Sequence, residues 1–108
     1  MAAYLLLALA IVAEVSGTVS LKLTEGFTKP LPSIVVVVGY GVAFTALALV
    51  LKLGMPIGVA YAIWAAAGVA LVAIIGVVFF GDKMTLAMIG GLALIIGGVV
   101  LLELGAAQ

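Results

Sequence analysis

Four long apolar runs, separated by short stretches that carry charges, glycine or proline, dominate the chain. Each run approximates the roughly 20 residues that an α-helix needs to cross a hydrocarbon core of about 30 Å. The pattern predicts an all-α integral membrane fold with transmembrane helices over residues 4–21, 33–51, 58–80 and 85–104. The connections are too short to hold a further domain, so residues 1–108 are expected to form a single four-helix transmembrane domain.

Composition supports lipid as the solvent of this fold. The chain is 69% hydrophobic and has only 4 basic and 4 acidic residues, whereas a soluble domain is about half apolar and about a quarter charged. It contains no cysteine and no histidine, which excludes disulfides, Cys/His metal centres and histidine-based catalysis. No basic stripe is present to neutralise phosphates, so we expect no nucleic-acid partner. No metal or other cofactor is expected either.

The only acid inside the first predicted helix is Glu14. It lies ~15 Å along the helix from Tyr4, which is near mid-membrane. A charged acid at that depth costs about 2.5–3.5 kcal/mol, and such residues generally mark an ion or substrate pathway. Because burial disfavours the charged form, we expect Glu14 to hold a proton and to release it when a cation pairs with it. The alternative is a neutral structural acid that is hydrogen-bonded to a neighbouring helix.

Small or polar residues share the helix face of Glu14 at the i±3 and i±4 positions. Ala10 and Gly17 leave room beside the carboxylate, and Thr18 adds a hydroxyl one turn away. These residues favour a space for a solute next to the acid. Close helix packing on small residues is the simpler interpretation, and the two are compatible.

Aromatic residues lie at similar depth in the predicted helices, and two pairs have helical spacing: Tyr40 with Phe44, and Tyr61 with Trp64. Aromatic faces beside a buried carboxylate attract large, weakly hydrated cations. The pattern therefore predicts a cavity for cationic, hydrophobic small molecules around Glu14. An interfacial aromatic belt is the alternative, and it suits Tyr4 well but Trp64 poorly.

Paired glycines in the fourth predicted helix indicate a packing face. Gly90 and Gly97 are seven residues apart, as are Gly91 and Gly98, so each pair lies on one face two turns apart. Small residues let helix backbones approach closely, which drives association in lipid. Four short helices enclose little volume, which favours a subunit interface here. Packing within the monomer is the alternative.

The balance of lysines across the membrane is nearly even. With four spans, both termini and Lys52 lie on one side, whereas Lys22, Lys29 and Lys83 lie on the other. The Lys/Arg difference normally sets the orientation of a membrane protein. Such a small difference predicts insertion in both orientations; selection of one by lipid composition or insertion kinetics is the alternative.

With these residues in place, the chain resembles the small multidrug resistance family of bacterial membrane transporters. The resemblance runs nearly end to end. It rests on AEVSGT around Glu14, on the loop LKLTEGFTKPLPS (residues 21–33) and on GVAYAIW (residues 58–64), in this order and at this spacing.

The resemblance implies a multi-pass protein of the bacterial inner (plasma) membrane that forms an antiparallel, dual-topology homodimer. It implies an antiporter, not an enzyme, that exports lipophilic or quaternary-ammonium cations, with protons and drug competing for Glu14. The implied proton- and substrate-binding residues are Glu14, Trp64, Tyr61, Tyr40, Tyr4, Phe44, Thr18 and Gly17. The implied dimer interface holds Gly91 and Gly98, beside which Gly90 and Gly97 lie.

Several alternatives remain open. The guanidinium-exporting branch of the family has a tryptophan three residues after its key glutamate; here that residue is Gly17, and Tyr40 also resembles the drug-exporting branch. A heterodimer with a related chain is the alternative to a homodimer. A non-transporting assembly subunit or rotor proteolipid also carries a lone intramembrane acid, although in a late helix of a hairpin. The chain departs from the family at Ala66, within its GVG pattern, and at Glu103, where a neutral residue is common.

Overall fold

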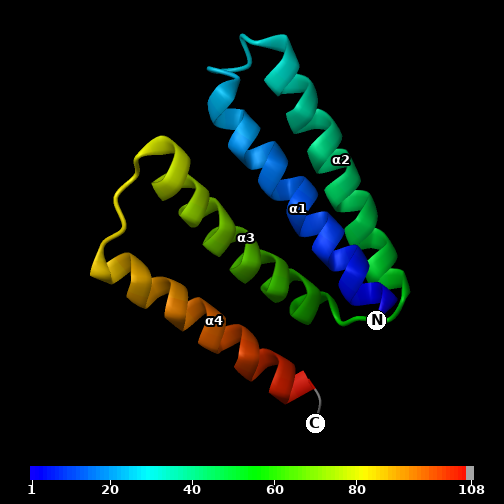
Figure 1. Ribbon diagram of the computed structural model, residues 1–108. Helices are drawn as coiled ribbons and strands as arrows, with labels where there is room; N and C mark the ends of the chain where they lie inside the picture. The colour runs from blue at the N-terminus through cyan, green and yellow to red at the C-terminus, as the bar shows by residue number, and fades with distance from the viewer. Residues whose placement is uncertain (107–108) are drawn as a thin grey trace. The chain divides into compact units, whose positions relative to one another are not determined.

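The computed structural model describes residues 1–106, and these form four α-helices joined by short connections (Figure 1). The helices are α1 (Ala2–Leu23), α2 (Pro30–Lys52), α3 (Ile57–Phe80) and α4 (Leu86–Ala106). All four are long and apolar enough to cross a membrane. The predicted all-α fold of four transmembrane helices is therefore confirmed.

The described chain divides into two compact helical hairpins, one over Met1–Met55 and one from Pro56 onward. In the first hairpin α1 packs along α2, and in the second α3 packs against α4. Because lipid offers no hydrophobic advantage to helix association, such contacts depend on close van der Waals packing of small side chains. Ala10 and Ala43 accordingly have no exposed surface. The expectation of one domain over residues 1–108 stays a prediction.

Helix α2 begins at Pro30, three residues earlier than the sequence pattern predicts. Both Pro30 and Pro32 lie in its first turn, where backbone N–H groups have no partner within the helix. A proline there loses no hydrogen bond, and its fixed φ suits the start of a helix. The prolines therefore open α2 instead of preceding it.

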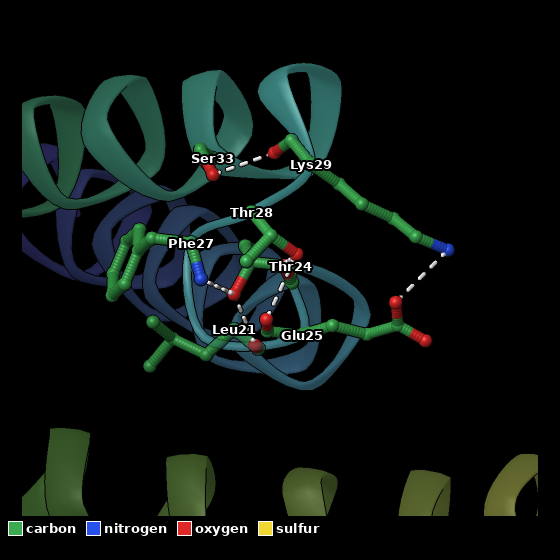
Figure 2. A network of polar contacts seen from close by, with 7 residues as sticks. All are labelled: Leu21, Thr24, Glu25, Phe27, Thr28, Lys29 and Ser33. Carbon is green, nitrogen blue, oxygen red and sulfur yellow. Dashed lines mark hydrogen bonds and ion pairs between the residues drawn. The ribbon is translucent and has the colours of Figure 1, made fainter.

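The connection between α1 and α2 is organised by Thr24, whose side chain is buried (Figure 2). The Thr24 hydroxyl donates to the Leu21 carbonyl oxygen at 2.7 Å and accepts from the Phe27 amide at 3.1 Å. The Thr28 hydroxyl donates to the carbonyl oxygens of Thr24 and Glu25, at 3.2 and 2.9 Å. These bonds satisfy a carbonyl of the last turn of α1 and backbone groups of the connection itself.

Three consecutive residues of this connection adopt left-handed backbone conformations: Glu25 (φ 48°), Gly26 (φ 74°) and Phe27 (φ 66°). Such a conformation costs a non-glycine residue roughly 1–2 kcal/mol. The surrounding hydrogen bonds must offset that cost. Thr24 and Thr28 thereby hold the tight turn that brings α2 back along α1. The exposed Lys29–Glu25 ion pair at 3.5 Å adds little.

The turn between α3 and α4 is built on Gly81, which caps α3 in the left-handed region (φ 71°). The next amide, of Asp82, donates to the Gly76 carbonyl oxygen at 3.0 Å. The Asp82 carboxylate then lies against Gly76, where a Cβ would overlap it. Thr85 begins α4 by accepting the Met88 amide on its hydroxyl at 3.1 Å, a typical helix N-cap.

Candidate functional site

The candidate site in the first hairpin is centred on Glu14, in the middle of α1. Its side chain is half-buried. One turn further along the same face, the Thr18 hydroxyl donates to Glu14 Oε1 at 2.6 Å. A short bond from a hydroxyl is the kind that a carboxylate forms as a strong acceptor. The sequence pattern predicts these two residues as neighbours, and the structure joins them directly.

Tyr40 on α2 extends this pair to the second helix. Its hydroxyl lies 2.8 Å from Thr18 Oγ1, so the three side chains form one continuous chain of hydrogen bonds. Thr18 has a single hydroxyl hydrogen, and in this arrangement it points to Glu14. Tyr40 is therefore the donor in its bond to Thr18. All three side chains are half-buried.

A close crossing of α1 and α2 positions this chain of hydrogen bonds. A Cβ built on Gly39 would lie 2.8 Å from the Ala13 carbonyl oxygen and 3.3 Å from the Gly17 Cα, so only glycine fits at position 39 without movement of the backbone. On α1, a Cβ at Gly17 would lie 3.4 Å from two carbons of the Tyr40 ring. The Tyr40 ring therefore rests on Gly17, which directs its hydroxyl toward Thr18.

The second hairpin holds the other aromatic pair, Tyr61 and Trp64 on α3. Their ring centroids are 6.0 Å apart with an interplanar angle of 65°, an edge-to-face contact. Trp64 is only 5% exposed, whereas Tyr61 is 60% exposed. A buried indole with a tyrosine ring against it suits an internal aromatic surface better than an interfacial belt.

Two further predicted site residues have exposed rings. Tyr4 and Phe44 are exposed, at 53% and 58%. Their part in ligand binding stays a prediction.

A shallow apolar groove of about 280 Å³ lies elsewhere on the first hairpin. Its lining contains none of the predicted site residues, and consists of Leu6, Leu9, Gly41, Val42, Thr45, Ala46 and Leu49. It lacks a charged side chain, so it has no group that would select a cation. We do not assign the site to it.

Two residues that shape the site were not expected from the sequence. Gly39 makes the helix crossing and Thr24 organises the loop that joins the two helices. The sequence does indicate a close helix contact near Tyr40, because Gly39 and Gly41 flank it and small residues let two helices approach closely. Spacing on one helix cannot say which of the two glycines faces α1.

A comparison with protein-family models decides the family. The model described as Small Multidrug Resistance protein matches residues 2–95. The chain belongs to the small multidrug resistance family. The resemblance carried by the three sequence motifs is thereby confirmed.

Relatives of this family member are similar over nearly their full length. The quaternary ammonium compound-resistance protein QacE of Escherichia coli is 48% identical over 104 residues, which cover 96% of this chain and 94% of QacE. The multidrug resistance protein Mmr of Mycobacterium tuberculosis H37Rv is 46% identical over 105 residues, with 97% and 98% covered. A multidrug transporter of Pseudomonas aeruginosa is 46% identical over 101 residues, with 94% and 91% covered.

Family membership and the four helices together establish the class of protein. It is a multi-pass protein of the bacterial inner membrane. Its relatives are transporters and resistance proteins, not enzymes. The sequence-based expectations of membrane location and of a non-enzymatic role in multidrug efflux agree with this result.

Proposed function

We propose that this protein exports lipophilic and quaternary-ammonium cations in exchange for protons, and that protons and drug compete for Glu14. The observation that carries the proposal is the half-buried Glu14 at the middle of α1, which accepts a hydrogen bond from Thr18. With this hydrogen-bond donor in place, Glu14 can be either protonated and neutral or ionised and negatively charged. The neutral state holds the proton, and the ionised state pairs with a cationic drug.

The protonated acid is neutral and is the form that the membrane interior tolerates best. When ionised, it retains the Thr18 donor, which offsets part of the cost of a buried charge. A cation that enters the site pairs with the ionised form and takes the place of the proton. This competition couples proton entry to drug exit without a covalent step.

Aromatic rings give the site its preference for bulky cations. Trp64 and Tyr61 form an edge-to-face pair, and the Tyr40 ring lies directly over Gly17 beside Glu14. Ring faces bind large, weakly hydrated cations by about 0.5–2 kcal/mol each, more when water is excluded. Tyr4 and Phe44 complete the proposed set of ligand contacts.

Gly17 favours drug export over guanidinium export. The guanidinium-exporting branch carries a tryptophan at this position, and here the corresponding space is occupied by the Tyr40 ring at van der Waals distance. The name of the relative QacE refers to quaternary ammonium resistance, which agrees with a substrate larger than guanidinium.

The proposed transporter is an antiparallel homodimer that uses α4 as its interface. In α4 no residue is buried in the described chain, and a Cβ at Gly90, Gly91, Gly97 or Gly98 would meet nothing within 4 Å. This open glycine face suits a second α4. An antiparallel pair of identical chains has two equivalent states, inward- and outward-facing, that interconvert when the subunits exchange shapes.

Uptake into proteoliposomes tests the proposal. With an outward-directed proton gradient, vesicles holding the parent protein should accumulate a radiolabelled quaternary ammonium compound, and Glu14→Gln should abolish this. Glu25→Gln is the matched control, because Glu25 lies in the α1–α2 connection and outside the proposed site. Gradient-driven uptake of guanidinium instead of the quaternary ammonium compound would assign the other branch. Uptake of neither by a folded protein would contradict transport by this chain alone.

A further inference from the structure

The hydrogen bonds around Glu14 have a defined direction. Threonine and serine inside a helix usually donate to the backbone carbonyl one turn earlier, as Ser16 does to Val12 at 2.8 Å. Thr18 instead donates to the Glu14 side chain and leaves its own oxygen to accept from Tyr40. Tyr40, the donor on α2, therefore acts on Glu14 through the Thr18 hydroxyl.

Tyr40 is held at this position by the backbone, not by the hydroxyl contact alone. Its ring carbons lie 3.4 Å from the position of a Cβ on Gly17, and a Cβ on the adjacent Gly39 would lie 2.8 Å from the Ala13 carbonyl oxygen. The phenol oxygen is therefore presented to Thr18 by the packing of α2 on α1. Such preorganised donors stabilise charge more effectively than groups that must reorient.

We infer that Tyr40 is a positioning residue that acts on Glu14 through Thr18, and that the two hydroxyls set the proton affinity of the transport site. The inference rests on the proposed function. When Glu14 is ionised, Tyr40 donates to Thr18 and Thr18 donates to the carboxylate. When the proton returns to Oε1, Glu14 donates to Thr18, Thr18 donates to Tyr40, and the phenol hydrogen becomes free for another acceptor.

No other ionisable group of this hairpin lies near enough to take this role. On α2, the helix packed against α1, the sequence between Lys29 and Lys52 holds Tyr40 alone, and each lysine lies more than about 15 Å along the helix from it. On α1, Lys22 lies about 12 Å along the axis from Glu14 and Tyr4 about 15 Å.

The role of the phenol hydroxyl is distinct from that of the Tyr40 ring. Loss of a donor to the ionised carboxylate makes deprotonation less favourable, so cation binding should need a higher pH. We expect the pH of half-maximal binding to rise by about 1 unit in Thr18→Val, which removes a hydrogen bond to a charged group. The rise should be about half a unit in Tyr40→Phe, which keeps the ring and removes only the second donor.

Calorimetric titration of the full-length protein in detergent with tetraphenylphosphonium, repeated across a series of pH values, tests the inference. The double variant Thr18→Val/Tyr40→Phe should shift no further than Thr18→Val alone, because Tyr40 acts only through Thr18. Thr18→Ser should retain the parent midpoint. Ser16→Ala, which removes a hydroxyl from another face of α1, should retain it as well.

The outcomes separate this inference from the proposed function. If the parent binds more tightly as the pH rises, Glu14→Gln shows no pH dependence, and Thr18→Val and Tyr40→Phe keep the parent midpoint, the hydroxyl chain is overturned while the proposed function stands. An equal loss of affinity at every pH would likewise reduce the two hydroxyls to a packing or ligand-contact role. A parent protein whose binding does not vary with pH would overturn both. Additive shifts in the double variant would contradict action through Thr18.

Discussion

Gly39 of α2 crosses α1 so closely that a Cβ on it would lie 2.8 Å from the carbonyl oxygen of Ala13. The obstacle is backbone, which cannot rotate away as a side chain would. This crossing holds Tyr40 over Gly17 and within reach of Thr18. The chemistry proposed for Glu14 therefore depends on a packing contact at Ala13, the residue next to the acid.

Gly39→Ala should destabilise the protein, because its new methyl group forces the two helices apart. Overpacking of this kind costs typically ~1–3 kcal/mol. Gly41→Ala is the matched control on the same helix, since a Cβ there meets nothing within 4 Å and alanine is the better helix former. Thermal unfolding in detergent, followed by circular dichroism, should show a lower midpoint for Gly39→Ala only. Equal midpoints for the two variants would refute the crossing.

Position 17 should tolerate alanine but not a large side chain. The Cβ of Gly17→Ala would lie at ordinary contact distance, 3.4 Å from the Tyr40 ring, so affinity for tetraphenylphosphonium should change little. Gly17→Leu must displace the ring and separate Tyr40 from Thr18. We expect its affinity to fall roughly tenfold, the equivalent of about 1.4 kcal/mol. Unchanged affinity in a folded Gly17→Leu protein would show that Tyr40 need not rest there.

The Thr24 hydroxyl should contribute to the stability of the α1–α2 hairpin. Thr24→Val keeps the shape of a buried side chain but leaves the Phe27 amide without its acceptor. Loss of an ordinary hydrogen bond of this kind costs about 0.5–1.5 kcal/mol. Thr24→Ser keeps the hydroxyl and should retain most of the stability. Protease cleavage within residues 24–29 should become faster in Thr24→Val, and a rate equal to that of Thr24→Ser would show that the hydroxyl is dispensable.

The glycine face of α4 should control dimerisation. Gly98→Leu fills a position that is open in the described chain, so two α4 helices could no longer approach closely. Fluorescence energy transfer between labelled subunits in lipid vesicles should show weaker association, by about tenfold or more. The control is Ile96→Leu, two residues away on the opposite side of the helix. Undiminished association of Gly98→Leu would place the dimer interface elsewhere.

The helices and the central acid could be predicted from the sequence because both depend on local chemistry. Span length and the cost of a buried charge identify α1 to α4 and Glu14 without reference to a neighbour. The Thr18–Glu14 contact follows from i, i+4 spacing on one helix. The sequence pattern did not predict the start of α2 at Pro30, because proline is typical both of loops and of the first turn of a helix.

Contacts between helices could not be predicted in the same way. The Tyr40–Thr18 bond depends on the register of α2 against α1, which follows from the Gly39 crossing and the left-handed turn at residues 25–27. Several glycines of α1 and α2 are equally small in sequence, but only those at the crossing face backbone or a ring. The roles of Trp64 and Tyr61 stay predictions for the same reason, since they depend on how elements meet around a ligand.

The most direct test of the account is proton release. Tetraphenylphosphonium should be added to the purified protein in weakly buffered detergent at a pH where Glu14 carries its proton, while the pH of the solution is recorded. The account predicts acidification by the parent protein and none by Glu14→Gln, with Glu25→Gln equal to the parent. Binding of the cation without proton release by the parent, or equal release by Glu14→Gln, would contradict the claim that proton and drug compete for Glu14.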